Sequence, residues 1–196
     1  MRAIWTRLAL AIATLALALA SGAANAECDF LTGGGFIINN GAKANFGVAG
    51  GCKDGMPTWG HLEYIDHGAG LNVHGTSITG YSKEGSDTTD SKGRPVGTRF
   101  ICGTARTNLA PPRDNVNFAV RARDAGEPGV MDEFDIQLTI PPGGAPFYTT
   151  DPFFLPPHHQ LNDGNGGGGN IQLHNPNPST TGNFSDPASC PAVQQF

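Results

Sequence analysis

The chain has 196 residues, and its 17 Asp and Glu residues outnumber its 12 Lys and Arg residues, which gives a formal net charge of -5. This balance argues against nucleic acid and anionic membranes as partners, because binding to phosphates needs clustered basic side chains. After residue 26 no apolar run approaches the roughly 18 residues of a transmembrane helix, so the sequence predicts no membrane span.

The first 26 residues have the features of an export signal. Arg2 and Arg7 supply positive charge, an apolar run follows over residues 8–20, and Ala24 and Ala26 occupy the small-residue positions of a cleavage site. We therefore predict a signal peptide over residues 1–26 and a secreted or periplasmic location. The mature chain would begin with Glu27 and not with the cysteine of a bacterial lipoprotein, so no lipid anchor is expected.

The four cysteines are expected to form disulfides, because export takes them to an oxidising compartment. None of them has the short spacing of a zinc-binding cysteine pair. Four cysteines allow three pairings, and the sequence alone does not choose among them. We expect Cys28 to pair with Cys190, which would tie the two ends of the chain together, and Cys52 to pair with Cys102, which would join two strand-like segments.

The mature chain predicts short strands and almost no helix. Apolar or alternating runs end at Gly, Pro, Asn and Asp, and no stretch keeps the apolar spacing of a helix. The expected strands are 35–38, 44–48, 61–65, 71–74, 77–81, 99–105, 117–123, 133–140 and 170–174. This pattern favours an all-β fold, an antiparallel β-sandwich that is Ig-like or jelly-roll-like, over a parallel sheet with helical crossovers. We expect one β-sandwich domain over residues 27–176.

The clearest predicted element is an antiparallel hairpin made by the seventh and eighth of these strands. In both runs apolar residues alternate with polar ones, so each strand would have one buried face. The polar faces would place Arg121 and Arg123 near Glu133 and Asp135. Opposite charges across the hairpin would then fix its register.

Two stretches without periodicity are expected to be long loops, insertions or hairpin arms. The first is residues 82–97, which are polar, and the second is residues 141–169, which are rich in Gly and Pro but contain several aromatic side chains. We expect the second stretch to fold back over one sheet, with an exposed recognition patch as the alternative. Residues 177–196 are expected to be a Pro/Asn/Ser-rich tail held only by Cys190.

Six segments, taken in chain order, resemble a family of exported bacterial domains, the post-choice-of-anchor domain family. They are GGGFI at 33–37, AKANFGV at 42–48, GHLEYIDHGAGLNVHGTSITGY at 60–81, GTARTN from residue 103, DAGEPGVMDEFDIQL at 124–138 and GGNIQLH at 168–174. The resemblance implies an all-β, secreted domain. No enzymatic activity or ligand is established for the family, so the resemblance adds no chemistry. The chain departs from the family pattern in its cysteines and in the greater length of residues 82–97 and 147–163.

A first candidate site is a group of metal-ligand residue types, Asp66, His67, His74 and His174. Imidazole and carboxylate groups are ligands for zinc or copper, and antiparallel strands can bring distant histidines together. The spacing matches neither an H-x-H strand pair nor an H-E-x-x-H helix pair. The alternative is that Asp66 and His67 bind the backbone of their own turn.

A second candidate site is the acidic loop with Asp124, Glu127 and Asp132, which could bind Ca2+ through carboxylate and carbonyl oxygens. The loop lacks the spacing of an EF-hand, and the alternative is a solvated hairpin turn. The possible cofactors are therefore Ca2+ or a transition metal.

The sequence contains no pattern that predicts catalysis. There is no G-x-S-x-G elbow, and Glu63 and Asp66 would face opposite sides of a strand, which is the wrong arrangement for a glycosidase pair. We therefore expect an exported, non-catalytic module with a binding or structural role toward a protein or a glycan. The alternative is a metal-binding protein or metal-dependent enzyme that uses the first candidate site.

Overall fold

The computed structural model describes residues 28–109, 114–141, 144–150, 156–162, 166–186 and 190, so the expected signal peptide lies outside the described residues. The described residues form nine strands and no helix, which confirms the all-β prediction. The strands are β1 (Phe30–Asn39), β2 (Ala42–Lys53), β3 (Met56–Asp66), β4 (Leu71–Thr89), β5 (Pro95–Thr107), β6 (Val116–Asp124), β7 (Glu133–Thr139), β8 (Pro146–Thr149) and β9 (Gly168–His174). With no helix present, no described segment meets the length and apolarity that a membrane-crossing helix requires.

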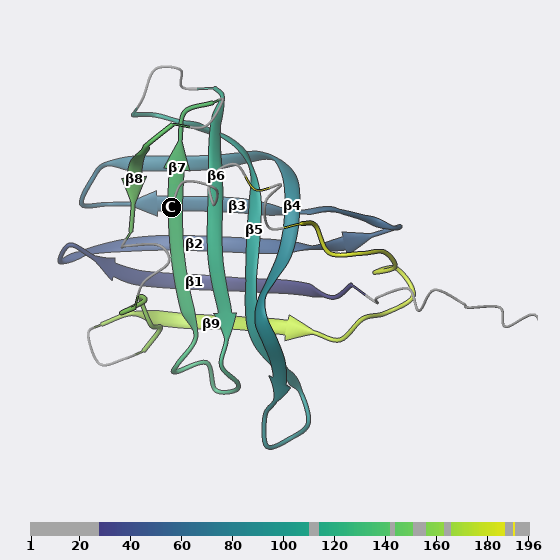
Figure 1. The fold of residues 1–196 in the computed structure, drawn as a ribbon. Helices are drawn as coiled ribbons and strands as arrows, with labels where there is room; N and C mark the ends of the chain where they lie inside the picture. Colours follow the sequence, from purple (N-terminus) through teal and green to yellow (C-terminus); the bar gives the residue numbers. More distant parts are fainter. Residues whose placement is uncertain are drawn as a thin grey trace, which may run out of the picture.

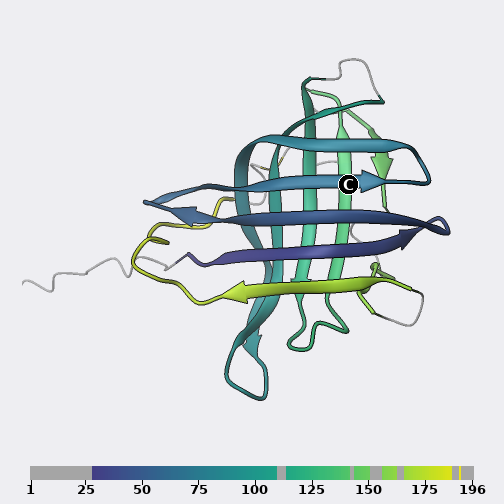
Figure 2. The same ribbon diagram turned by 180° about the vertical axis from the view of Figure 1, so that it is seen from behind.

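All nine strands belong to one antiparallel sheet with the order β8-β7-β6-β5-β4-β3-β2-β1-β9. Figures 1 and 2 show β5 to β8 running across β1, β2, β3 and β9, with β4 bending from one group of strands into the other. The sheet therefore folds over on itself. Two separate sheets, as in an Ig-like or jelly-roll sandwich, are not what the structure shows.

The bend is made by β4, whose pairing with β5 shifts register between Gly75 and Ser77 and again between Ile78 and Gly80. Such bulges bend and twist a strand without ending it. The expected strands 71–74 and 77–81 are consequently parts of one long strand of 19 residues. The same strand continues into residues 82–97, which were expected to be a long loop, an insertion or a hairpin arm. These residues form the outer arm of the β4–β5 hairpin, which confirms the hairpin-arm alternative.

Two-residue turns explain why β1, β2 and β3 pair in sequence. Asn40 and Gly41 join β1 to β2, and Asp54 and Gly55 join β2 to β3, all four with positive φ angles between 49° and 85°. Asn-Gly and Asp-Gly adopt this conformation readily, and its twist matches that of the flanking strands.

The core lies between the crossing parts of the sheet. Phe46 of β2 stacks on Phe134 of β7 with 3.9 Å between ring centroids, although the two strands are far apart in the sheet order. Ile101 of β5 packs directly over Gly50 of β2, where a Cβ atom would lie 2.7 Å from the isoleucine side chain. The close packing of β5 over β2 at this point therefore depends on a glycine.

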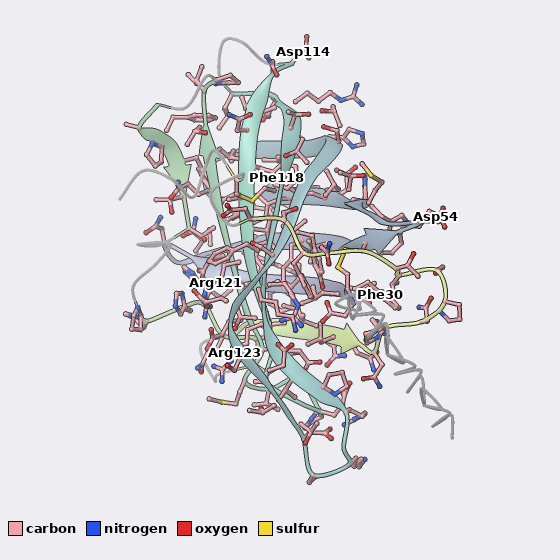
Figure 3. The ribbon with its side chains drawn as sticks, turned by 45° about the vertical axis from the view of Figure 1, so that its right-hand side comes forward. Phe30, Asp54, Asp114, Phe118, Arg121 and Arg123 are labelled. Carbon is pink, nitrogen blue, oxygen red and sulfur yellow. A yellow bond between two sulfur atoms is a disulfide. The ribbon has the colours of Figure 1, made fainter. Side chains whose placement is uncertain are left out.

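The predicted β6–β7 hairpin is confirmed in its register. Arg121 pairs with Asp135 and Arg123 with Glu133 across the two strands, and the two arginines follow each other along β6 (Figure 3). Both arginines bind the Glu133 carboxylate at 2.6 Å. The face of β7 that was expected to be solvated is instead buried along the whole strand. At Asp135 the long loop supplies His158 and His159, which bind the carboxylate at 2.8 and 2.9 Å. The described part of residues 141–169 thus folds back over the sheet as expected, and it adds the short strand β8 that the sequence did not predict.

The structure corrects the expected disulfide pairing. Cys28 is bonded to Cys52 and Cys102 to Cys190, with 5.7 Å between the Cα atoms of each pair. β1 pairs with β2 so that Phe30 lies opposite Gly51, which brings Cys28, just before β1, next to Cys52. Both cysteines lie in the main core. Cys102 points to the other face of β5, into a small separate cluster with Cys190, so it cannot reach Cys52.

The C-terminal tail is held at more points than Cys190. The amide of Asp54 donates to the carbonyl of Ser179, and the amide of Ser185 donates to the carbonyl of Tyr81. The Phe184 ring stacks on the Tyr81 ring at 5.7 Å. The described tail residues therefore pack as part of the domain.

Arg99 is a fully buried cation beneath this tail. Its guanidinium binds Asp29 through two nitrogens and Asp87 through one oxygen at 2.7 Å and the other at 2.9 Å. The Tyr81 hydroxyl also donates to Asp29, at 2.7 Å. A buried charge with so many partners fixes β5 against the segment that precedes β1.

Candidate metal centre

The alternation of side chains along β3 places His61 and Glu63 on the outer face of the sheet, while Leu62 and Tyr64 enter the core. His74 of β4 is the direct cross-strand partner of Glu63, so it projects from the same face. The two-residue spacing of His61 and Glu63 along β3 and the pairing of Glu63 with His74 therefore bring three potential metal ligands together.

The three side chains contact one another. The Nδ1 atom of His74 donates to Glu63 Oε1, and His61 Nε2 lies 3.3 Å from the same oxygen. The imidazole rings meet edge to face with 5.5 Å between their centroids. One ligand atom from each residue lies within 4.8 Å of the others, and no second group of three does so among the residues that the structure describes.

Two imidazole nitrogens and one carboxylate oxygen form a ligand set for zinc, copper or nickel. Calcium and magnesium are poor matches, since they take oxygen ligands almost exclusively. The side chains of His61, Glu63 and His74 are 54%, 47% and 40% exposed, so an ion held here would keep coordination positions open to solvent or to a further ligand.

A groove of about 500 Å3 runs beside the cluster and is lined in part by Glu63 and His74. Its other walls include Ile65 of β3, Arg106 of β5 and Asp114, which Figure 3 shows just before β6. The groove beside Glu63 and His74 is therefore large enough for a small molecule.

The metal site expected from the sequence does not form as a set. Only His74 belongs to the cluster, because Asp66 points to the inner face of β3 and His74 to the outer face. His67 is exposed in the following turn, 3.0 Å from the Asn45 side chain. His174 lies on β9, with β1 and β2 between it and β3, and it stacks on Phe30 at 4.3 Å.

Asp66 binds the backbone of its own turn, as expected in the alternative to a metal site. Its carboxylate accepts hydrogen bonds from the amides of Gly68 and Ala69 at 2.8 and 3.0 Å, from Asn39 at 2.8 Å and from the Tyr148 hydroxyl at 2.5 Å. Burial by itself raises the pKa of Asp66, but these four bonds together lower it below its ordinary value. The carboxylate therefore closes the β3–β4 turn and ties it to β8.

The acidic loop has a structural part as well. Asp132 accepts the amides of Ala125 and Ile171 at 2.9 and 2.7 Å, and Asp124 accepts the amide of Leu173 at 2.7 Å. Two of these amides belong to β9, an edge strand of the sheet, so the carboxylates satisfy backbone donors that no further strand could pair.

Burial raises the pKa of Asp132 to about 6. Glu127, the third residue of the expected calcium site, contacts Arg94 and Asn170. Calcium binding in this loop stays a prediction.

A second hollow, of about 200 Å3, lies where the tail passes β2 and β3. Phe30, Trp59 and Lys53 line it together with tail residues Asn177 and Thr180. The Phe30 and Trp59 rings meet edge to face with 6.0 Å between their centroids. This hollow has an aromatic wall but none of the three metal-ligand residues.

His61 and Glu63 were missed as candidate ligands, although an H-x-E pattern on a strand places both side chains on one face. Recognising the third ligand requires the register of the β3–β4 hairpin, which the sequence analysis did not assign. The judgement that Glu63 and Asp66 face opposite sides is confirmed.

Comparisons of the chain with protein-family models, with curated proteins and with solved structures give no match. The resemblance to the post-choice-of-anchor domain family stays a prediction.

Proposed function

We propose that this protein is an exported, non-catalytic β module that binds one divalent transition-metal ion on the outer face of β3 and β4. The observation that carries the proposal is the convergence of His61, Glu63 and His74, whose ligand atoms lie within 4.8 Å of one another. Convergence of this kind between two strands brings the ligands together before the metal arrives, which lowers the conformational entropy lost on binding.

Export is supported by the leader-like N-terminus and by the two disulfides, since disulfides persist in oxidising compartments. In such a compartment the cysteines are oxidised and do not compete for the metal. The imidazole and carboxylate groups on the surface are then the available ligands.

The proposal is restricted to binding because of the position of Glu63. In hydrolytic zinc sites a glutamate that is not a ligand serves as the general base. Here Glu63 lies between the two histidines and contacts both, so we assign it as a third ligand and not as a general base.

The test is metal binding by the mature protein produced without a histidine tag. After treatment with EDTA and dialysis, isothermal titration with ZnCl2 and with CuCl2 should show one ion per chain. His61→Ala and His74→Ala should each weaken binding by about tenfold or more, since loss of even a supporting residue has an effect of this size.

The matched controls are His67→Ala and His174→Ala, which remove a histidine outside the cluster. Both should bind the metal as the wild type does. Equal weakening in all four variants would mean dispersed histidine binding, and an absence of binding in the wild type would remove the proposed function.

A further inference from the structure

Arg106 extends the row of outer-face side chains that contains the metal ligands. Glu63 of β3 pairs with His74 of β4, and His74 pairs with Arg106 of β5. Directly paired residues on one face of a sheet have Cβ atoms about 4.5 to 5.5 Å apart. Arg106 therefore borders the same groove as Glu63 and His74.

Arg106 differs from the other described arginines in its surroundings. Four arginines bind carboxylates, namely Arg94, Arg99, Arg121 and Arg123. Arg106 is exposed, and its side chain has no hydrogen bond or ion pair with any residue that the structure describes. Its five N–H donors are thus available to a molecule in the groove.

The charge of the groove depends on the metal. Without an ion, Glu63 and Asp114 outweigh Arg106, so an anion would be repelled. A divalent ion on the cluster reverses the sign of the local charge. It also supplies a coordination position for an oxygen ligand, because the cluster is open to solvent.

We propose that the metal-loaded groove binds a small organic carboxylate. This inference rests on the proposed function, which is metal binding by the cluster. One carboxylate oxygen takes an open position on the metal, and the carboxylate accepts hydrogen bonds from Arg106, whose planar fork suits this geometry. The carbon skeleton lies on Ile65, a groove residue that is 40% exposed. The groove volume of about 500 Å3 leaves room for a skeleton of several carbon atoms.

The test uses isovalerate, a branched carboxylate, and isovaleramide, its uncharged counterpart of the same shape. Binding to 15N-labelled mature protein is followed by amide chemical shifts, with zinc bound and without it. Isovalerate should shift amides of β3, β4 and β5 around the groove only in the zinc-loaded protein. Isovaleramide should bind at least about tenfold more weakly, because its carbonyl oxygen can accept a hydrogen bond from Arg106 but the amide lacks the negative charge that attracts the metal ion and the guanidinium.

Arg106→Gln should weaken isovalerate binding by about tenfold or more and leave zinc binding unchanged. Lys92→Gln is the matched control, because it removes one positive charge from an exposed residue at the β4–β5 turn and should have no effect. Equal binding of the amide and the carboxylate, binding without zinc, or full binding by Arg106→Gln would overturn the inference. Failure of zinc itself to bind would be seen in the zinc titration first, and would identify the proposed function as the step that is wrong.

Discussion

Removing the two disulfides one at a time should destabilise the protein by unequal amounts. The Cys28–Cys52 bond closes a loop of 24 residues and the Cys102–Cys190 bond a loop of 88 residues. In the chain-entropy model these loops contribute about 3.5 and about 4.6 kcal/mol to the free energy of unfolding, because the longer loop restricts the unfolded chain more. The Cys102→Ser/Cys190→Ser variant should therefore be the less stable of the two double variants, by about 1 kcal/mol.

Urea unfolding followed by circular dichroism measures both differences, and reduced wild-type protein serves as the reference that lacks both bonds. The pairing itself can be checked directly, since trypsin cleavage after Lys43, Lys53, Arg99, Arg106 and Arg123 separates all four cysteines.

Without reduction, peptide 44–53 should be joined to the peptide that ends at Lys43, and peptide 100–106 to the one that begins at Asp124. Linkage of peptide 44–53 to peptide 100–106 would refute the pairing. A larger loss of stability from removal of the shorter loop would refute the entropic argument.

Two further stability measurements test the buried charges. Arg99→Met should reduce the free energy of unfolding by about 3 to 5 kcal/mol, because it leaves Asp29 buried without its cation, whereas the exposed Arg123→Met should cost less than about 1 kcal/mol. A similar small loss in both would contradict the network seen in the structure. Burial raises the pKa of Asp132 to about 6 from 3.8, so the folded state holds this proton more tightly than the unfolded state does. The contribution of this proton to stability is complete below about pH 4 and is lost as the pH rises through 6. Between pH 4 and pH 7 the wild type should therefore lose about 3 kcal/mol more of its free energy of unfolding than Asp132→Asn does, as measured by unfolding curves at each pH. Parallel pH profiles of the two proteins would show that Asp132 titrates normally.

Alternation of residue types was enough to predict the β6–β7 hairpin and the ion pairs of Glu133 with the two arginines, but not the binding of Asp135 by His158 and His159. Each strand alternates with a period of two, and the charges of Arg121, Arg123 and Glu133 admit one register. The same alternation correctly separated Glu63 from Asp66. The face on which a side chain lies depends only on the alternation along its own strand, so it can be predicted without knowledge of the rest of the fold.

The outer arm of the β4–β5 hairpin shows why other strands were missed. Residues 82–89 are in strand conformation but largely exposed, so no apolar face marks them in the sequence. Their strand structure comes from pairing with β5, which is a contact between segments and not a property of either.

Residue types and their spacing were enough to predict the all-β class, the disulfide-bonded cysteines and the opposite faces of Glu63 and Asp66. They could not predict which cysteines pair or which side chains join His74, because both depend on which strands become neighbours in the folded sheet. The bulges in β4 change the direction of the strands on either side of them, so they decide which residues far apart in the chain come into contact. Local patterns fix the direction of a side chain, and the folding of the sheet chooses its partner.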